Sequence, residues 1–199
     1  MRARDIMTTP VVTVRPDTTV KAAAALLAER GFTALPVVDD DEALVGIVTE
    51  ADLIHQRIPP DPRVRARHTT PRATSSTVAE VMSSPAVAAG PGADLTELTA
   101  ALLKARHRSV PIVDGSRLVG IITRRDLLRV LARSDTDIAR DVRHRLEIYG
   151  GPGRWAVQVH DGVVTVADEY HDVTDDHVAV VLAEAVPGVV RAEVSGPAE

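Results

Sequence analysis

The sequence predicts an α/β protein, of the α+β kind, in which one unit is present twice and a smaller unit follows. The first observation is a near-repeat: residues 44–54 read LVGIVTEADLI and residues 118–128 read LVGIITRRDLL. The second is that short apolar runs alternate with amphipathic stretches, which is typical of strands alternating with helices. The third is a change of charge, because residues 1–134 hold 18 Lys/Arg against 15 Asp/Glu, whereas residues 135–199 hold 5 against 13.

Each copy is expected to fold in the order β-α-β-β-α, and the two copies to pack against each other as a pair. The elements expected in the first copy are a strand at 11–14, a helix from Pro16-Asp17 to Gly31, strands at 36–39 and 44–48, and a helix capped by Thr49. The second copy repeats this order, with its long helix near 94–107. The stretch from Thr77 to Glu80 fits a capping box.

The register between the copies is continuous. At an offset of 75, the matching residues are Met7, Pro10, Pro16, Pro36 and Asp39 with Met82, Pro85, Pro91, Pro111 and Asp114. After a one-residue deletion, Gly46, Thr49 and Asp52 match Gly120, Thr123 and Asp126. The copies therefore span 1–56 and 77–133, and the proline- and arginine-rich residues 57–76 are expected to form an exposed linker.

The acidic third unit, residues 135–197, is expected to fold in the order α-β-β-α-β. Its elements are a helix at 135–149, a strand at 155–160, a two-residue turn at Asp161-Gly162, a strand at 163–169, a helix at 174–186 and a strand at 189–194. The Asp-Gly dipeptide between two alternating apolar runs is a strong hairpin signal. Ile138, Val142, Leu146 and Tyr149 are expected to line the buried face of the first helix, and Val178, Val181, Leu182 and Ala185 that of the second.

Composition narrows the function classes. The chain contains no cysteine, which excludes disulfides, thiolate metal sites and cysteine nucleophiles. No apolar run reaches the roughly 18 residues of a membrane span, and MRARDIM lacks the apolar run of a secretory signal. A cytoplasmic protein is therefore expected. The histidines of the third unit do not have the spacing of a metal site, and no hydrolytic or dinucleotide-binding motif is present, so no catalytic or metal-ligating residue is assigned.

Three motifs occur twice and in the same order: Met-x-x-Pro, Pro-Val-Val-Asp or Pro-Ile-Val-Asp, and Gly-x-x-Thr-x-x-Asp-Leu. In these motifs residues 1–133 resemble the tandem CBS domain pair, or Bateman module. The resemblance implies that an adenine nucleotide such as AMP, ADP or ATP binds between the copies. It also implies that Asp52 and Asp126 hold the ribose hydroxyls and that Thr49 and Thr123 hold a phosphate.

The residue types suit these roles. A threonine at a strand-to-helix junction lies beside free N–H groups at the positive end of a helix, and a carboxylate accepts two hydrogen bonds from a diol. The adenine and ribose are expected near Thr13, Ala34, Pro36, Ser109, Val110 and Pro111. The alternative is that the threonines and aspartates only cap their helices, which would make the pair an interaction scaffold that binds no ligand.

The two motifs differ in charge. Arg124 and Arg125 flank Asp126, and residues 106–108 add further basic groups before the following strand, whereas Glu50 takes the place of Arg124 in the first copy. Because guanidinium groups bind phosphate through paired charge-assisted hydrogen bonds, the sequence predicts unequal sites, with Thr123–Asp126 dominant. The alternative is that these arginines form a solvated helix face.

The third unit is similar to a BON domain. The similarity rests on Val-x-Val-x-Asp-Gly-Val-Val-Thr-Val, a helix, and Val-Pro-Gly-Val-Val-x-Ala-x-Val. Its negative charge opposes an anionic bilayer and favours docking to a protein or to the basic linker. The linker lacks aromatic residues for base stacking, which disfavours nucleic acid.

The function expected for the whole chain is that of a non-catalytic nucleotide sensor. It is expected to form a homodimer through helices 18–30 and 94–107, and its third unit is expected to serve as a docking tail.

Overall fold

The computed structural model describes residues 1–55, 76–104, 107–170 and 172–195, so the expected linker lies outside the described residues apart from Ser76. The chain divides into two compact units. The duplicated unit is Met7–Arg124, and the C-terminal unit is Arg125–Glu199 together with Met1–Ile6.

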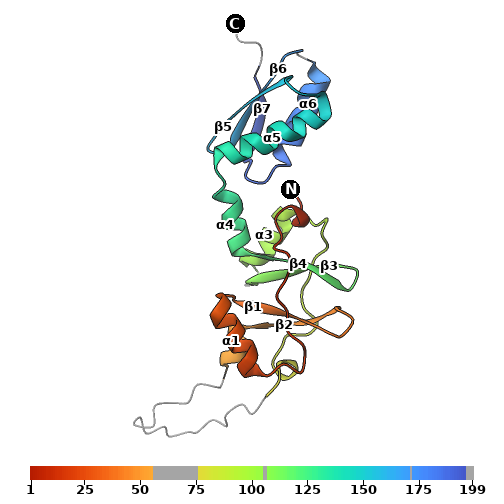
Figure 1. Ribbon diagram of the computed structural model, residues 1–199, viewed down its shortest axis with the longest axis vertical. Coiled ribbons are helices and arrows are strands. Elements are labelled where there is room, and N and C mark those ends of the chain that lie inside the picture. The colour runs from red at the N-terminus through yellow and green to blue at the C-terminus, as the bar shows by residue number, and fades with distance from the viewer. Residues whose placement is uncertain (56–75, 105–106, 171, 196–199) are drawn as a thin grey trace, which may run out of the picture. The chain divides into compact units, whose positions relative to one another are not determined.

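The duplicated unit contains one antiparallel hairpin for each copy (Figure 1). In the first copy β1 (Ala34–Val38) pairs with β2 (Leu44–Thr49), and in the second β3 (Ser109–Asp114) pairs with β4 (Arg117–Thr123). The helices of this unit are α1 (Val20–Arg30), α2 (Glu50–Ile54) and α3 (Leu95–Lys104), with a short 3₁₀ turn, η2 (Val78–Glu80). The predicted mixed fold class is confirmed.

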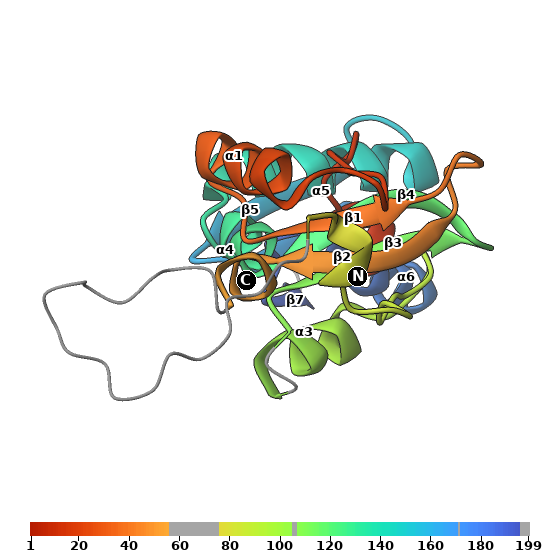
Figure 2. The ribbon, with the colours of Figure 1, turned by 90° about the horizontal axis from the view of Figure 1, so that it is seen from below.

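Helix α1 covers one face of the first hairpin (Figure 2). Its residues Val20, Ala23 and Leu27 pack into an aliphatic core with strand residues such as Leu35 and Val48. The predicted stop at Gly31 is confirmed, because this residue closes the helix in the left-handed conformation with φ 63°.

The predicted start of α1 at Pro16-Asp17 is wrong. Thr19 is the N-cap, and its hydroxyl accepts a hydrogen bond from the Ala22 N–H. Thr18 takes part in a preceding turn in which its hydroxyl accepts the Arg15 N–H at 3.0 Å. Pro16 also lies outside the helix, and its carbonyl accepts the N–H of Ala79 at 2.8 Å.

Two other local predictions are also wrong. Residues 11–14 do not form a strand, since only Val14 makes a parallel bridge, to Val37 of β1. The stretch from Thr77 to Glu80 does not form a capping box. It forms η2, where Thr77 makes no side-chain cap and the Glu80 carboxylate accepts the Ser76 N–H at 2.9 Å.

The two copies exchange their leading segments. Ser83 bridges Ile47 of β2, and Thr8 bridges Ile121 of β4. Each leading methionine lies over the glycine of the other copy's Gly-x-x-Thr motif: Met82 packs on Gly46 and Met7 packs on Gly120. Val78 of η2 is fully buried in the core of the first copy. Each hairpin is therefore completed by residues that belong, in sequence, to the other copy.

The C-terminal unit contains a three-stranded sheet and two long helices, α5 (Asp135–Gly150) and α6 (Val173–Glu184). Its strands are β5 (Trp155–His160), β6 (Val163–Asp168) and β7 (Arg191–Val194). The 3₁₀ turn η1 (Ala3–Asp5) and, apart from its first residue, helix α4 (Arg124–Leu131) also belong to this unit. The strand order is β5-β6-β7, with β6 and β7 parallel. Asp161 and Gly162 both have positive φ, 47° and 75°, which confirms the predicted two-residue hairpin turn.

The buried faces of the two helices differ in part from the prediction. Ile138, Val142 and Leu146 are buried as predicted, but Tyr149 is exposed and its hydroxyl donates to Asp175. In α6 the predicted Val181 is 53% exposed. The buried residues of α6 are Ala179 and Ala183, and Val186, which follows the helix, is buried as well. The buried face of α6 is therefore rotated about the helix axis relative to the predicted face.

An ionic cluster joins the sheet of the C-terminal unit to α6. The Arg154 guanidinium donates to both carboxylate oxygens of Asp168 at 2.7 Å and to Asp175 at 2.5 Å. The same guanidinium lies over the rings of Trp155 and Tyr170. The Asp168 side chain is fully buried, and its ion pair with Arg154 holds the Asp168 pKa well below the ordinary value of 3.8.

Candidate functional site

A cavity of about 260 Å³ lies between the two copies of the duplicated unit. The first copy contributes the end of β2 and the start of α2. The second copy contributes its leading segment and the start of β3. The lining residues are Ile47, Thr49, Glu50, Ala51, Ser83, Pro85, Ala86, Val87, His107, Arg108 and Ser109. Because both copies contribute, the cavity depends on their pairing.

Thr49 and Asp52 form a reciprocal cap at the start of α2. The Thr49 hydroxyl donates to Asp52 Oδ2 at 2.7 Å and the Thr49 N–H donates to the same oxygen at 2.8 Å. The Asp52 N–H returns a longer bond of 3.4 Å to the Thr49 hydroxyl oxygen. Among the described residues, nothing donates to the other carboxylate oxygen, Asp52 Oδ1. Asp52 itself is not among the residues that line the cavity, whereas Thr49 is.

A cross-copy ion pair forms part of the cavity wall. Arg108 Nη1 lies 3.0 Å from Glu50 Oε2, and the two side chains are 61% and 42% exposed. The sequence places residues 106–108 next to the Thr123 motif, but the structure brings His107 and Arg108 to the cavity that contains Thr49. The reason is the pairing of the copies, in which the start of β3 faces the end of β2 and not only its own hairpin partner. The cationic side of this cavity therefore comes from the opposite copy.

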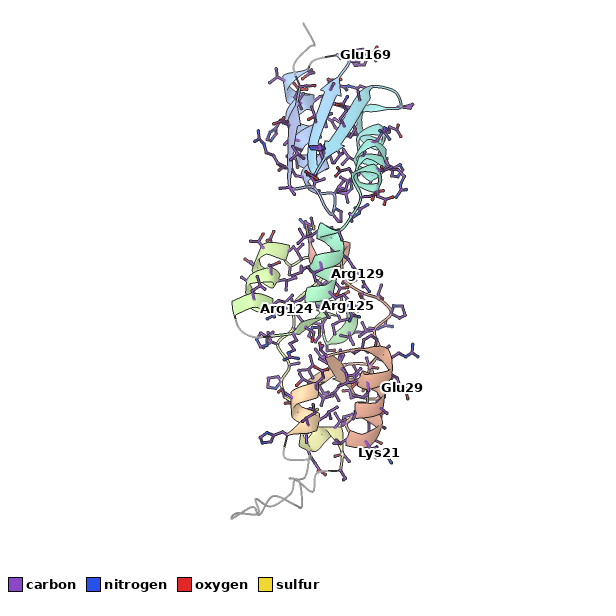
Figure 3. All side chains as sticks on the ribbon, turned by 90° about the vertical axis from the view of Figure 1, so that its left-hand side faces the viewer. Lys21, Glu29, Arg124, Arg125, Arg129 and Glu169 are labelled. Carbon is purple, nitrogen blue, oxygen red and sulfur yellow. The ribbon has the colours of Figure 1, made fainter. Side chains whose placement is uncertain are left out.

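The second Thr-x-x-Asp motif occupies the junction of β4 and α4 (Figure 3). The Arg124 guanidinium donates from Nε and Nη2 to the Leu102 carbonyl, at 3.0 and 2.6 Å, and so caps the end of α3. Asp126 is 4% exposed and is paired with Arg129 at 3.0 Å. The boundary between the two compact units falls between Arg124 and Arg125.

The residues expected to hold the base divide into two groups. Ser109 lines the cavity together with Thr49. Ala34, Pro36, Val110 and Pro111 are buried within their strands and Thr13 is half-buried; none of these five residues lines the described cavity. Residues in the middle of the strands thus pack in the hydrophobic cores of the hairpins. Residues at the ends of the strands line the cavity.

Sequence reasoning missed most of the wall that the second copy supplies, namely Ser83, Pro85, Ala86 and Val87. These residues follow Met82 in the Met-x-x-Pro motif, so the motif itself is the signal that marks them. What the motif does not reveal is which copy it faces. The antiparallel bridge between Ile47 and Ser83 settles this point.

Within the part of the chain that the structure describes, no group of three or more histidine or acidic residues is placed to hold a metal ion. None of the described helices has the length and apolar character needed to cross a membrane.

Two copies of one α/β unit that line a common cavity are typical of a binding module that arose by duplication. Residues 3–58 and 78–133 each match the CBS domain, and the chain belongs to the CBS domain family, with two such domains in tandem.

The relatives match over the same region. Inosine-5'-monophosphate dehydrogenase of Mycobacterium tuberculosis (strain ATCC 25618 / H37Rv) is 37% identical over 137 residues, which are 66% of this chain and 23% of the enzyme. The chain thus spans about a quarter of that relative. Of the solved structures, CBSX2 of Arabidopsis thaliana in complex with AMP has a TM-score of 0.53 and 28% identity, covering 64% of this chain and 93% of CBSX2.

A second solved structure is the CBS domain pair of protein MJ0100 in complex with 5'-methylthioadenosine and S-adenosyl-L-methionine. It has a TM-score of 0.53 and 26% identity, and the match covers 65% of this chain and 94% of the domain pair. The ligand in CBSX2 thus carries a phosphate, and the two ligands in the MJ0100 domain pair do not.

Proposed function

We propose that this chain is a non-catalytic regulatory protein that senses an adenine nucleotide between its paired CBS domains. The observation that carries the proposal is the cavity itself, which brings Thr49 of one copy next to Ser109 of the other. CBS pairs of similar structure bind AMP or S-adenosylmethionine-related compounds. The ligand is expected to place its ribose hydroxyls on Asp52 and its base against the apolar residues of the leading segment.

Sensing follows from the shared walls of the cavity. A ligand that touches both copies binds one arrangement of the pair better than another, and it shifts the population toward that arrangement by its difference in affinity. We propose that the second Thr-x-x-Asp motif, from Thr123 to Asp126, binds the phosphorylated nucleotide more tightly. This motif has Arg124 and Arg125 at its centre, whereas the first motif has Glu50 and Ala51. Arg124 also caps α3 through the Leu102 carbonyl, a neutral partner that does not repel a phosphate as the Glu50 carboxylate does.

We expect Asp52→Asn and Asp126→Asn each to weaken AMP binding by about ten- to a hundredfold at its own site, because a carboxylate that accepts ribose hydroxyls is replaced by a neutral amide. Isothermal titration of the full chain measures both affinity and stoichiometry. Asp40→Asn, in the exposed turn between β1 and β2, is the matched control and should leave the affinity unchanged.

A thermal-shift panel of AMP, ADP, ATP, S-adenosylmethionine, cyclic dinucleotides and NADH identifies the ligand class. A ligand at about a hundred times its Kd adds roughly 2.7 kcal/mol of stability to the unit that binds it. If no compound shifts the unfolding of a well-folded sample, the proposed sensor is wrong and a ligand-independent scaffold is the remaining function. The reciprocal Thr49–Asp52 cap is the observation that favours this alternative.

We further propose that the protein is cytoplasmic, that it forms a homodimer through α1 and α3, and that its C-terminal unit is a BON-like domain that docks to a protein partner. The exposed face of α1 is rich in alanine, and Leu103 of α3 is 60% exposed. The net negative charge of the C-terminal unit disfavours an anionic membrane surface as its partner.

A further inference from the structure

We propose that Glu50 is an internal competitor for Arg108, which makes the Thr49 cavity select an adenosine derivative that carries no phosphate. The inference rests on the proposed function, because it assigns a ligand class to one of the two sites. In the cavity wall, Glu50 and Arg108 form an ion pair at 3.0 Å. The cation that a phosphate needs is therefore already paired.

The ion pair contributes little to the stability of the fold. Both side chains are substantially exposed, at 61% for Arg108 and 42% for Glu50, and exposed pairs of this kind are screened by solvent. A phosphate arriving at Arg108 has to displace the Glu50 carboxylate or lie beside it. Two like charges about 4 Å apart near a protein surface repel each other strongly enough to change affinity by roughly tenfold or more.

This arrangement is a property of one copy only. In the register of the repeat, Glu50 corresponds to Arg124 and Arg108 corresponds to Thr33. The second motif thus has a cation where the first has an anion, and a neutral threonine stands at the position equivalent to Arg108. The duplication has kept the Thr-x-x-Asp frame in both copies and reversed the charge next to it. Two sites built in this way are suited to two chemically different ligands.

The size of the cavity supports the same ligand class. Its volume of about 260 Å³ lies just under the lower end of small-molecule pockets, which is roughly 300 Å³. A nucleoside-sized ligand matches this volume better than a nucleoside triphosphate. The apolar wall of Ile47, Pro85, Ala86 and Val87 is suited to the base and to an uncharged 5'-substituent.

The test is isothermal titration of the full chain with two probes, AMP and 5'-methylthioadenosine, which differ in the 5'-substituent and in charge. The titrations are made in a chain that carries Asp126→Asn, which removes the ribose acceptor of the second motif. With Glu50 present, 5'-methylthioadenosine should bind at least about tenfold more tightly than AMP. Glu50→Gln should tighten AMP by about tenfold and change 5'-methylthioadenosine by less than about twofold.

Arg108→Gln, added to Glu50→Gln, should abolish the gain for AMP and leave 5'-methylthioadenosine unchanged. The matched control is Glu42→Gln, which removes the carboxylate of another exposed pair, with Arg15 at 2.8 Å, away from the cavity. The control should alter neither affinity. The inference is overturned if both probes bind but Glu50→Gln leaves the ratio of their affinities unchanged. Absence of binding by either probe in every folded variant, the chain with an intact second motif included, instead overturns the proposed nucleotide site as a whole.

Discussion

Replacing Arg154 with methionine should lower the melting temperature of the C-terminal unit by more than about 10 °C. The guanidinium makes two bonds of 2.7 Å to Asp168 and one of 2.5 Å to Asp175. The Asp168 side chain is fully buried, so the substitution leaves a carboxylate inside the unit without its cation. Breaking a buried pair from one side is strongly destabilising, because the remaining charge is neither solvated nor paired.

Trp155 is the single tryptophan of the chain and lies in this unit, so its emission follows the unfolding of the unit within the intact protein. The matched control is Arg191→Met, which removes an exposed pair with Glu193 at 2.8 Å and should shift the melting temperature by no more than about 2 °C. An equally small shift for Arg154→Met would show that the cluster does not hold the sheet and α6 together.

The effect should also depend on pH. The ion pair with Arg154 lowers the pKa of Asp168 below its ordinary value of 3.8, so the pair stabilises the fold above that pH. This contribution is lost as the pH falls below 3.8 toward the lowered pKa of the folded state. In the Arg154→Met variant, burial favours the protonated, neutral form of the Asp168 carboxyl. Lowering the pH therefore protonates Asp168 and reduces the destabilisation of the variant. The difference in melting temperature between wild type and Arg154→Met should therefore narrow between about pH 7 and about pH 3.

The second large effect is expected where the two copies interlock. A Cβ at Gly46 would lie 2.7 Å from Met82 Sδ and 2.9 Å from the Ser83 carbonyl oxygen, and a Cβ at Gly120 would meet the side chain of Met7, with Cγ at 2.8 Å. We expect Gly46→Ala and Gly120→Ala each to destabilise the duplicated unit by roughly 1–3 kcal/mol, as overpacking of a closed contact does. Urea denaturation followed by circular dichroism measures the loss.

The two glycines should differ in how they can be rescued. Around Gly120 the obstructing atoms belong to a side chain, so Met7→Ala should recover most of the loss in a double-mutant cycle. Around Gly46 a backbone carbonyl remains after Met82→Ala, and the recovery should be incomplete. Gly92→Ala is the control, because a Cβ there meets nothing within 4 Å. Equal behaviour of all three alanine variants would contradict the interlock.

The sequence predicted the hairpins, the helix stop at Gly31 and the turn at Asp161-Gly162, because each depends on local chemistry that a few residues determine. It predicted α6 less well. The stretch VAVVLAEAV is apolar at almost every position, so periodicity does not identify which side is buried, and the structure selects Ala179 and Ala183 because small side chains allow a close approach to the sheet.

The candidate site could be predicted only in part, for a different reason. The motif identifies Thr49 and Asp52, and the repeat identifies the corresponding residues of the second copy. The register does not reveal which copy supplies the opposite wall. That depends on how the copies pair, which is a long-range property. Ser109 pairs with Thr123 of its own copy, and the pairing of the copies also brings Arg108 to the cavity of Thr49.

The exchange of leading segments has a consequence for how such a protein can arise and persist. A single copy on its own would lack the leading segment that packs on its hairpin. It could obtain that segment only from a second molecule of the same kind. Joining two halves in a single polypeptide replaces that encounter by an internal one at a local concentration in the millimolar range. Once joined, the halves can diverge in charge and ligand while each still depends on the other for completion.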